Sequence, residues 1–559
     1  QELPDKLPLK MPQQSRLIGK PVSRLDAPAK VDGSARFAID VELEGMVNAA
    51  IKHPPIFGAK IKSVDDSKAR QAAGVIDVFT IDSGVVVVAD TFWHAKKGAD
   101  QLRIQWTQPE SVPDTEAIRR SWLGLAREDG DGLRDDGDIK DAMDEADHTL
   151  SAVYELPYQA HATMEPMNCT VDLGKDYCDV WVGTQGQGPT IETVVALTDL
   201  DYDQVRIHTT YLGGGFGRRG EVDFVAEAVL IAKRIKRPVK LIWTREEDMQ
   251  HDFYRPASYH VLSGAVKQGQ AHAWQHRIVG PSIMQRVAPG FVPAAMPRWL
   301  PRGLKSFSAW AAGGVIGMIN DATLTEGAED HPYAIPNVEV DLVTYDPGVP
   351  IGFWRSVGHS SNAFVVESFI DELAHQAKAD PYEFRRGLLK EHPRHLAVLD
   401  LAADKAGWGK SLPAGRGMGI AVHKSFESYA AQVAEVEVDD KGGVKVRRVV
   451  CAIDCGIAVN PDTIAAQVEG AIVYGLSAAL KGEITLKQGR VEQSNFHDFQ
   501  VLRLQDMPTV EVHIVPSMES PTGVGEPGLP VIAPAVTNAI FAATGNRLRR
   551  LPINARDLA

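Results

Sequence analysis

The alternation of hydrophobic and polar positions predicts a small mixed α/β unit near the start of the chain. Between residues 37 and 106, strand-like runs such as FAIDVEL, VIDVFTI and VVVVAD alternate around a helical stretch at 91–101 and end in the strand LRIQW. This unit contains no clustered set of acid–base or nucleophilic residues. We therefore expect it to have a structural or interfacial role.

From about residue 148 the pattern predicts strand pairs interrupted by helices. The runs SAVYEL, CTVDLG, CDVWVGT and QVRIHTTYL precede a helix at about 221–236, which is apolar on most of its circumference and is therefore buried. Further helices are predicted over NAFVVESFIDELAHQAKA and after Asp380-Pro381, Asn460-Pro461 and Pro534. A chain of 559 residues can hold two to four such domains.

An acidic segment separates these two regions. Between Glu128 and Asp147 the chain has ten acidic residues, two basic residues and three glycines. This composition is typical of a solvated connector or helix surface, and we expect a domain boundary near it. The calcium-binding loop pattern with its terminal Glu is absent from the segment.

Charge and cysteine usage exclude several classes of protein. A net charge of -14 with a pI near 5.7 argues against a nucleic-acid partner, because such partners require clustered Lys and Arg. The pair Arg218-Arg219 is interpreted as part of a solvated face. Cys451 and Cys455 lie in an apolar run and are interpreted as buried thiols, so any iron–sulfur cluster is expected on another chain.

The chain is expected to be soluble, because no apolar run approaches the roughly 18–20 residues of a membrane span. Its first residues, QELPDKLPLKMPQQ, lack the basic and apolar regions of a signal peptide and do not begin with Met. We expect that a leader or longer N-terminal portion has been removed, or that the chain starts partway through a larger product.

A glycine-rich turn at 207–228, IHTTYLGGGFGRRGEVDFVAEA, is the first candidate for chemistry. Gly215, Gly217 and Gly220 satisfy G-x-G-x-x-G between a strand-like run and a helix, as in dinucleotide-binding units. The turn is embedded among antiparallel-looking strands, however, and the next acidic residue, Glu246, comes later than such units require. Dinucleotide binding, a structural turn and another backbone-mediated site all remain open from the pattern alone.

Three other loops have a similar character. PYQAHATMEPM at 157–167 holds Gln, His and Glu in a short stretch between strands, and IGFWRSVGHSS at 351–361 places an Arg in a Gly-flanked turn. PTGVGEPGLP at 521–530 carries Glu526 among Gly, Pro and apolar residues. A poorly solvated carboxylate suits general-base work, although one that accepts hydrogen bonds from turn amides is the equal alternative.

Together these segments resemble the molybdenum hydroxylases, the family of xanthine dehydrogenase and aldehyde oxidoreductase large subunits. The nearest resemblance is to the isoquinoline 1-oxidoreductase beta-subunit type and to membrane-associated aldehyde dehydrogenases. The segments that carry it run in family order along nearly the whole chain: RLDAPAKVDGSARFAIDVELEGM, PYQAHATMEPMNCT, GTQGQGPT, LGGGFGRR, FWRSVGHSSNAFVVESFIDELA with ADPYEFR, DCGIAVNP with QVEGAIVYG, and GVGEPGLP.

The resemblance implies an α+β fold in which an α/β hammerhead domain precedes two mixed α/β molybdopterin-binding domains. The corresponding divisions are a lead-in at 1–20, the hammerhead domain at 21–108, the acidic connector at 109–147, and molybdopterin-binding domains at 148–390 and 391–559. The last of these is expected to be incomplete and to be completed by another chain.

The resemblance also implies the site. Glu526 matches the catalytic base, and no protein side chain is expected to ligate the metal. The residues expected to bind the cofactor are Gln159, Gly214, Gly215, Phe216, Gly217, Arg355, Ser356 and Gly525. The cofactor is expected to be molybdenum with molybdopterin, in its cytosine dinucleotide form.

The implied reaction is oxidation of an aldehyde or of an N-heterocyclic C–H, with water as the oxygen source and iron–sulfur clusters as the electron acceptor. Relatives that oxidise purines carry a substrate-binding Glu where this chain has Arg218-Arg219-Gly220-Glu221, so xanthine is not expected. Glu165 and Glu221 are candidates for substrate contact, although packing or helix-start roles are the favoured interpretation. Two alternatives remain: an NAD(P)-dependent dehydrogenase that uses the turn at 215–220, and a non-catalytic subunit.

The expected partners follow from features of the family that this sequence does not contain. Relatives have a Met-Gly-Gln-Gly cofactor loop, which this sequence does not contain, so a second polypeptide is expected to supply it. A small 2Fe-2S subunit should carry electrons away, and a cytochrome c can follow it. A periplasmic location is expected by analogy with the isoquinoline type.

Overall fold

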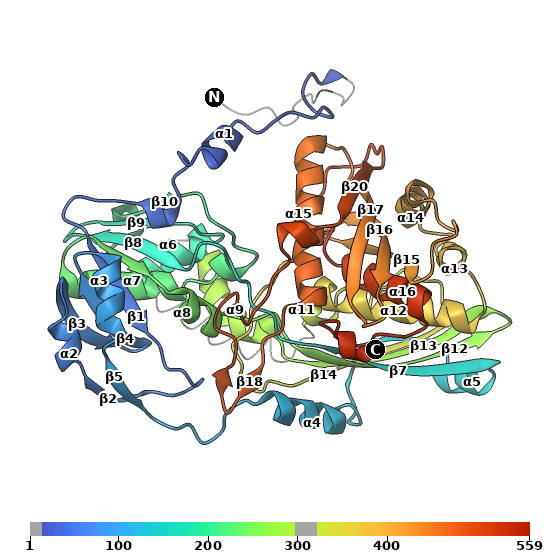
Figure 1. The fold of residues 1–559 in the computed structure, drawn as a ribbon, viewed down its shortest axis with the longest axis horizontal. Coiled ribbons are helices and arrows are strands. Elements are labelled where there is room, and N and C mark those ends of the chain that lie inside the picture. Colours follow the sequence, from blue (N-terminus) through green and yellow to red (C-terminus); the bar gives the residue numbers. More distant parts are fainter. Residues whose placement is uncertain (1–9, 11–13, 297–320, 559) are drawn as a thin grey trace.

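The protein is an α+β structure with two lobes (Figure 1). The structure, a computed structural model, describes residues 10, 14–296 and 321–558. Within those residues, one lobe is built on a seven-stranded sheet, and the other on a five-stranded and a four-stranded sheet. The fold class predicted from the sequence is therefore confirmed.

The seven-stranded sheet is covered on both faces. All six residues of β4 (Gly84–Ala89) are buried. Val85 and Val87 pack with the α3 side chains, whereas Val86 and Val88 face the cluster that contains the α7 side chains. The strands, in spatial order, are β10 (Val205–Thr209), β9 (Cys178–Val182), β8 (Asn168–Leu173), β11 (Val239–Ile242), β1 (Val47–Lys52), β4 and β3 (Val75–Ile81), and the covering helices include α3 (Phe92–Ala99), α6 (Gln187–Leu197) and α7 (Asp223–Ile235).

This sheet crosses a predicted domain boundary. β1 belongs to the segment predicted as the hammerhead domain, and it pairs in parallel with β11, with Val47 opposite Val239. Strands from 21–108 and from 148–390 therefore share one hydrogen-bonded sheet. The smaller strands β2 (Ile61–Asp65) and β5 (Arg103–Trp106) pair with each other outside it.

The acidic segment at 109–147 is more than a connector. It contains α4 (Thr115–Leu125), β6 (Asp131–Asp136) and α5 (Ile139–Asp144), and β6 is an edge strand paired antiparallel with β14 (Asn337–Thr344). Because an edge strand exposes much of its surface, acidic side chains are tolerated there and oppose further pairing. The strand β6 could therefore not be recognised from the sequence pattern, because its residues are mostly charged.

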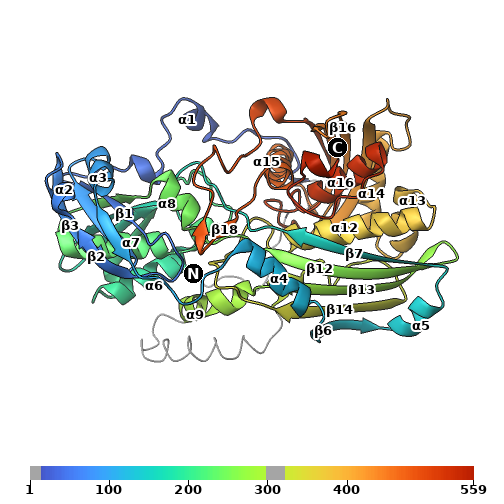
Figure 2. The same ribbon diagram turned by 60° about the horizontal axis from the view of Figure 1, so that its bottom comes forward.

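The five-stranded sheet packs against the buried helix α12 (His359–Gln376), as Figure 2 shows. The sheet has the order β6, β14, β13 (Gln270–Gly280), β12 (Ser258–Lys267) and β7 (His148–Leu156). The acidic residues on α12 are balanced by arginines: Arg385 binds Glu367, and Arg547 and Arg549 bind Asp371 and Glu372. This pairing lets a helix that contains charged residues lie in the core.

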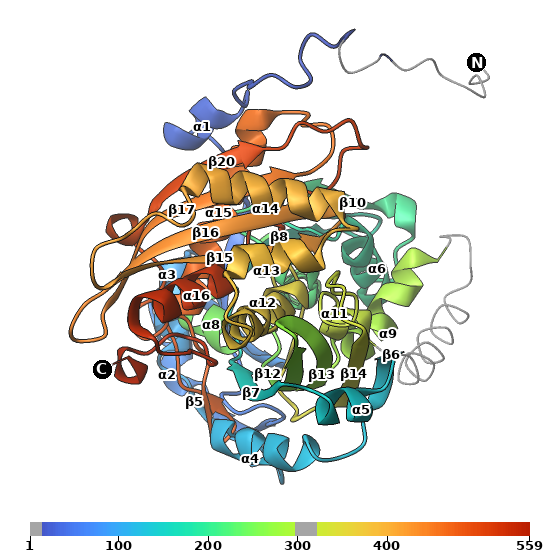
Figure 3. The ribbon, with the colours of Figure 1, turned by 90° about the vertical axis from the view of Figure 1, so that its right-hand side faces the viewer.

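The four-stranded sheet carries α14 along one side (Figure 3). Its strands are β15 (Arg416–Ser425), β16 (Ser428–Val438), β17 (Val444–Asp454) and β20 (Thr509–Ile514). The helices around it are α13 (Pro381–Leu388), α14 (Pro393–Ala406), α15 (Pro461–Leu480) and α16 (Ile532–Thr544). The remaining labelled elements are α1 (Ala27–Val31), α2 (Ser67–Arg70), α8 (Arg245–Gln250), α9 (Ile283–Ala295), α11 (Ala322–Thr325), β18 (Leu486–Lys487) and β19 (Arg490–Val491).

Within the described ranges, α15 is the one helix that is long and apolar enough to cross a membrane by length and composition. Its most apolar stretch is 44% buried, and the helix contacts α16 and β20. A core helix meets the same criterion, so this finding alone does not identify a membrane span.

A buried ion pair joins β1 to the helices beside it. The ring nitrogens of His53 lie 2.8 Å from Glu227 and 2.9 Å from Glu247. Burial lowers the pKa of this imidazole, but the two carboxylates outweigh burial and raise the pKa to about 10. The protonated bridge therefore stabilises the fold fully below pH 6.5, and this stability is lost as the pH rises through about 10.

We expect the melting temperature of the wild type to fall as the pH rises from 6.5 to about 10, because the folded protein binds this proton more tightly. The H53Q substitution should lower the free energy of unfolding at neutral pH by about 3–5 kcal/mol, as expected when a buried pair loses one partner. It should also flatten the pH dependence. Calorimetry of both proteins across this range tests the prediction, and identical slopes would contradict it.

Candidate active site

The glycine turn lies between β10 and α7 and has an unusual backbone. Gly214, Phe216 and Gly217 have positive φ angles of 98°, 55° and 114°. A Cβ on Gly217 would lie 1.7 Å from the Phe353 carbonyl oxygen, so the two loops approach as closely as bare backbone allows. A left-handed phenylalanine costs conformational energy, and such strain is concentrated at functional sites.

The turn presents free backbone donors. Among the described residues, none accepts a hydrogen bond from the N–H groups of Gly214, Gly215 or Phe216. The next amide, that of Gly217, donates to Gln185 Oε1 (3.1 Å). Consecutive free N–H groups at such a bend form a concave site for oxygen atoms that carry negative charge.

The dinucleotide-binding alternative does not fit this fold. In such a unit the strands on either side of the helix lie next to each other, whereas β9 and β8 separate β10 from β11. In addition, a Cβ on Gly220 would meet nothing within 4 Å, so the third glycine of the motif is not required for close packing.

Arg218 and Arg219 correct the sequence interpretation of a solvated face. Their side chains are 1% and 0% exposed. Arg219 donates to the Gly214 carbonyl (2.8 Å) and to Glu165 (3.0 Å), which also accepts from the Gly213 amide (2.7 Å). Arg219 therefore holds the backbone of the glycine turn in place, and Glu165 has the packing role expected from the sequence.

A second left-handed turn, at 354–358, faces the first one. Ser356 and Val357 have φ angles of 75° and 45°. Arg355 donates from Nε to the Gly525 carbonyl (2.8 Å), and the amide of Ser356 donates to Glu526 Oε1 (3.0 Å). The Ser356 hydroxyl donates to the Glu526 carbonyl oxygen (2.9 Å). This turn therefore holds the loop that carries Glu526.

The two turns and the Glu526 loop enclose a cavity of about 550 Å³, which we call the Glu526 cavity. The predicted site residues that line it are Gly214, Gly215, Phe216, Gly217, Arg355, Gly525 and Glu526. Residue 526 is thus brought to the glycine turn, although more than 300 positions separate them in the chain.

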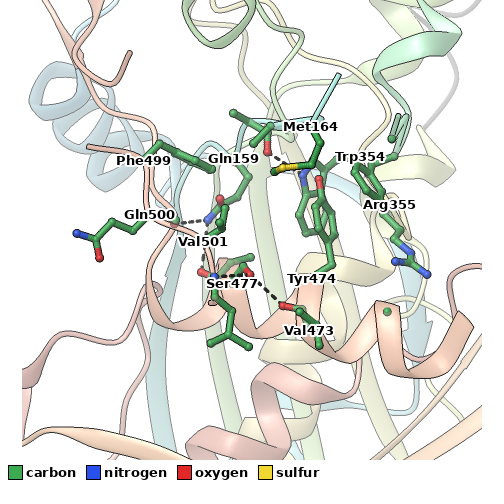
Figure 4. A pocket seen from close by; sticks show the side chains of 18 of the residues that line it. Gln159, Met164, Trp354, Arg355, Val473, Tyr474, Ser477, Phe499, Gln500 and Val501 are labelled. Atoms are coloured by element: carbon green, nitrogen blue, oxygen red, sulfur yellow. Dashed lines mark hydrogen bonds between the residues drawn. The ribbon is translucent and has the colours of Figure 1, made fainter. Parts of the chain in front are cut away.

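A second cavity of about 630 Å³, the Gln159 cavity, adjoins the first. The two cavities share the lining residues Gly214, Phe216, Trp354 and Arg355. Gln159 is buried, and its Nε2 donates to the Gly482 carbonyl just after α15. Figure 4 shows Gln159, Met164, Trp354 and Tyr474 around this cavity. The predicted residues therefore gather at two connected spaces.

Sequence reasoning missed two aromatic residues that line the Gln159 cavity, Trp354 and Tyr474. Tyr474 stacks on Phe216 (4.3 Å between ring centroids) and on Trp354 (4.8 Å), and its hydroxyl donates to the His161 carbonyl (2.8 Å). A signal was available, because the residues of α15 that line the Gln159 cavity recur at helical spacing: Ala466, Glu469, Gly470, Val473, Tyr474, Ser477 and Ala478.

The arrangement fits a molybdenum–pterin group. The glycine turn offers unpartnered amides, the cavities have room for a cofactor and a small substrate, and the loops approach through backbone that a side chain would obstruct. The residues that would hold the group are the turn amides on one side and Gln159 on the other.

Comparison with known proteins gives the family. Two models, each described as a molybdopterin cofactor-binding domain, match residues 128–290 with 306–388, and residues 394–508. The chain is 32% identical to the membrane-bound aldehyde dehydrogenase (pyrroloquinoline-quinone) of Gluconacetobacter polyoxogenes, over 99% of this chain and 74% of that protein. It is 30% identical to isoquinoline 1-oxidoreductase subunit beta of Brevundimonas diminuta, over 96% and 68%.

A solved structure supports the same fold. The structure of quinoline 2-oxidoreductase from Pseudomonas putida 86 aligns with a TM-score of 0.78 over 97% of each chain, at 14% identity. The chain therefore belongs to the molybdenum hydroxylase family, as a molybdopterin-binding large subunit. It is a molybdopterin-dependent oxidoreductase, and the first family model already includes β6 of the acidic segment.

Proposed function

We propose that the Glu526 cavity oxidises an aldehyde or a C–H bond beside a ring nitrogen, with water as the oxygen source. The observation that carries this proposal is a carboxylate that shares one cavity with the free amides of the glycine turn. For an aldehyde, substrate and water become a carboxylic acid, two protons and two electrons. The molybdenum–pterin group supplies the two-electron redox chemistry when bound.

The chain's own residues position the cofactor and the catalytic carboxylate and remove a proton from the oxygen source. The amides at 214–216 would bind the cofactor, while Arg355 ties the Glu526 loop to the second turn. The Ser356 amide fixes one oxygen of the Glu526 carboxylate, and its other oxygen is available to take a proton from the oxygen source. A non-catalytic subunit would not need this arrangement.

Molybdenum dependence and substrate class can be tested together. Protein from cells grown without molybdate should fold normally but lack dye-linked oxidation of every member of a panel of aldehydes and N-heterocycles. Protein from molybdate-supplemented cells should oxidise at least one member, and its molybdenum content should track activity. Full activity without molybdenum would contradict the proposal.

We infer that the pterin carries a cytosine nucleotide. The Gln159 cavity supports this, because its volume of about 630 Å³ lies beside the Glu526 cavity and leaves space beyond a metal centre. Acid hydrolysis of the purified protein should release cytidine monophosphate in proportion to molybdenum. Release of molybdenum and pterin without a nucleotide would indicate the mononucleotide form.

We also propose that the chain works within a complex. In the described residues the four cysteines are free and buried, which favours a 2Fe-2S cluster on a partner, and a cytochrome c is the proposed next acceptor. Met164 (66% exposed) and Met507 (39% exposed) line the Gln159 cavity, so further polypeptide can cover its mouth and complete the cofactor pocket. Native mass spectrometry should find additional chains, and a lone active chain would contradict this.

The periplasm is the proposed location, by analogy with the isoquinoline type. Cell fractionation should find the activity with periplasmic rather than cytoplasmic markers.

A further inference from the structure

A second carboxylate holds the same backbone turn as Glu526. The Gly358 amide donates to Glu326 Oε1 (2.8 Å), just as the Ser356 amide donates to Glu526 Oε1 (3.0 Å). The two donors are two residues apart, at the left-handed bend that leads into α12. Acids from two distant segments therefore cap one turn, which also carries Arg355.

The loop that carries Glu326 packs directly on this turn. A Cβ added to Gly358 would lie 2.4 Å from the Thr323 carbonyl oxygen and 3.0 Å from the Glu326 Cγ. Non-glycine residues in the left-handed region persist only when their surroundings hold them there. Glu326 contributes to that hold for Ser356 and Val357 through the next amide in the turn, that of Gly358.

The histidines near Glu326 do not neutralise its charge. His359 Nε2 lies 3.5 Å from Glu326 Oε2, and His359 Nδ1 lies 2.9 Å from His423 Nε2. Burial lowers the pKa of His359 to about 4 and the pKa of His423 well below its ordinary value. The charged and titratable groups around Glu326 and His359 are Asp330 on the same loop, His359 on α12, His423 and Lys424 on β15, and Glu526.

Both charge states of Glu326 are accessible near neutral pH. Burial raises the pKa of this carboxyl to about 7, against the effect of the amides that it accepts from, and the charges of Asp330 and Glu526 raise it further. Lys424 pairs with Glu427 (3.1 Å). Above neutral pH Glu326 therefore adds a negative charge near Glu526, and among the described residues no Lys or Arg pairs with Glu326.

We propose that Glu326 is a positioning residue for Glu526: it accepts from the Gly358 amide and so braces the turn that presents the Ser356 amide to Glu526. This inference rests on the proposed function, because it assigns Glu526 as the base. The charge of Glu526 raises the pKa of Glu326, so the coupling between the two carboxylates can be measured on Glu326.

The E326Q substitution keeps a hydrogen-bond acceptor of similar size for the Gly358 amide and removes the charge. Because a charged carboxylate holds an amide more strongly than a neutral acceptor does, wild-type kcat should rise as the pH passes through about 7, and this step should be missing from E326Q. KM and molybdenum content should change little. E326A removes the brace as well, so it should lower kcat further, and E326Q should restore part of that loss.

E329Q is the matched control, because Glu329 lies on the same loop and neither turn amide donates to it. It should leave the pH profile in place. A step near pH 7 that persists unchanged in E326Q, with normal molybdenum content, would overturn the proposal.

Infrared difference spectroscopy gives a readout that needs neither molybdenum nor turnover. In the wild type, a carboxylic-acid C=O band should disappear as the pH rises through about 7, and this band should be missing from E326Q. In E526Q the band should titrate at lower pH, because Glu326 has lost its charged neighbour. A band that is unchanged in E526Q would contradict the coupling. A shifted band, combined with failure of the protein to take up molybdenum from molybdate-supplemented cells, would instead refute the proposed function alone.

Discussion

Glu526→Gln should lower the rate of substrate oxidation by about 10²- to 10⁴-fold, the range expected when a general base is removed. The substitution preserves size and one acceptor oxygen, so the Ser356 amide keeps its 3.0 Å partner. The hydroxyl of Ser356 binds the main chain of residue 526 and is unaffected. We therefore expect loss of kcat with nearly normal molybdenum content and melting temperature.

Glu519→Gln is the matched control for this experiment. Glu519 is an exposed acid on the same loop and does not line either cavity. Steady-state assays with an artificial electron acceptor, together with metal analysis of each protein, make the comparison. Turnover of the Glu526 variant within a few-fold of the wild type, at full molybdenum content, would remove Glu526 as the base.

Gly217→Ala should abolish cofactor binding rather than chemistry. Its Cβ would lie 1.7 Å from the Phe353 carbonyl oxygen, and the residue has φ of 114°. A conformation of this kind costs an L-residue about 1–3 kcal/mol before the clash is counted. Because about 1.4 kcal/mol is tenfold in affinity, we expect molybdenum content below about a tenth of the wild-type value.

Gly220→Ala provides the contrast within the same motif. A Cβ at this position meets nothing within 4 Å, and the residue does not have a positive φ. It should retain molybdenum and activity. If Gly220→Ala and Gly217→Ala lost the cofactor equally, the sequence motif itself would matter rather than the close approach of the two turns.

Much of the site could be predicted because its chemistry lies in loops with unusual composition. Glycine and proline mark the backbone around Gly217 and Glu526, and the order of these segments along the chain carried the family resemblance. The buried helix α7 could also be predicted, since its apolar residues cover most of its circumference.

Other features depend on contacts between distant segments, which a local pattern does not contain. In the sequence Arg219 is typical of a surface charge, but in the structure it is bound by Glu165 and the Gly214 carbonyl. The residues of β6 are typical of a solvated segment, but in the structure they form a strand by pairing with β14. Glu326 carries no local signal, because its significance comes from the Gly358 amide 32 residues away.

Anomalous diffraction at the molybdenum absorption edge, from crystals of the purified protein with its partners, tests the central claim most directly. We predict one strong molybdenum peak inside the cavity that Gly215, Phe216, Arg355 and Glu526 line. The absence of such a peak from active crystals, or a peak remote from both the glycine turn and Glu526, would contradict the account.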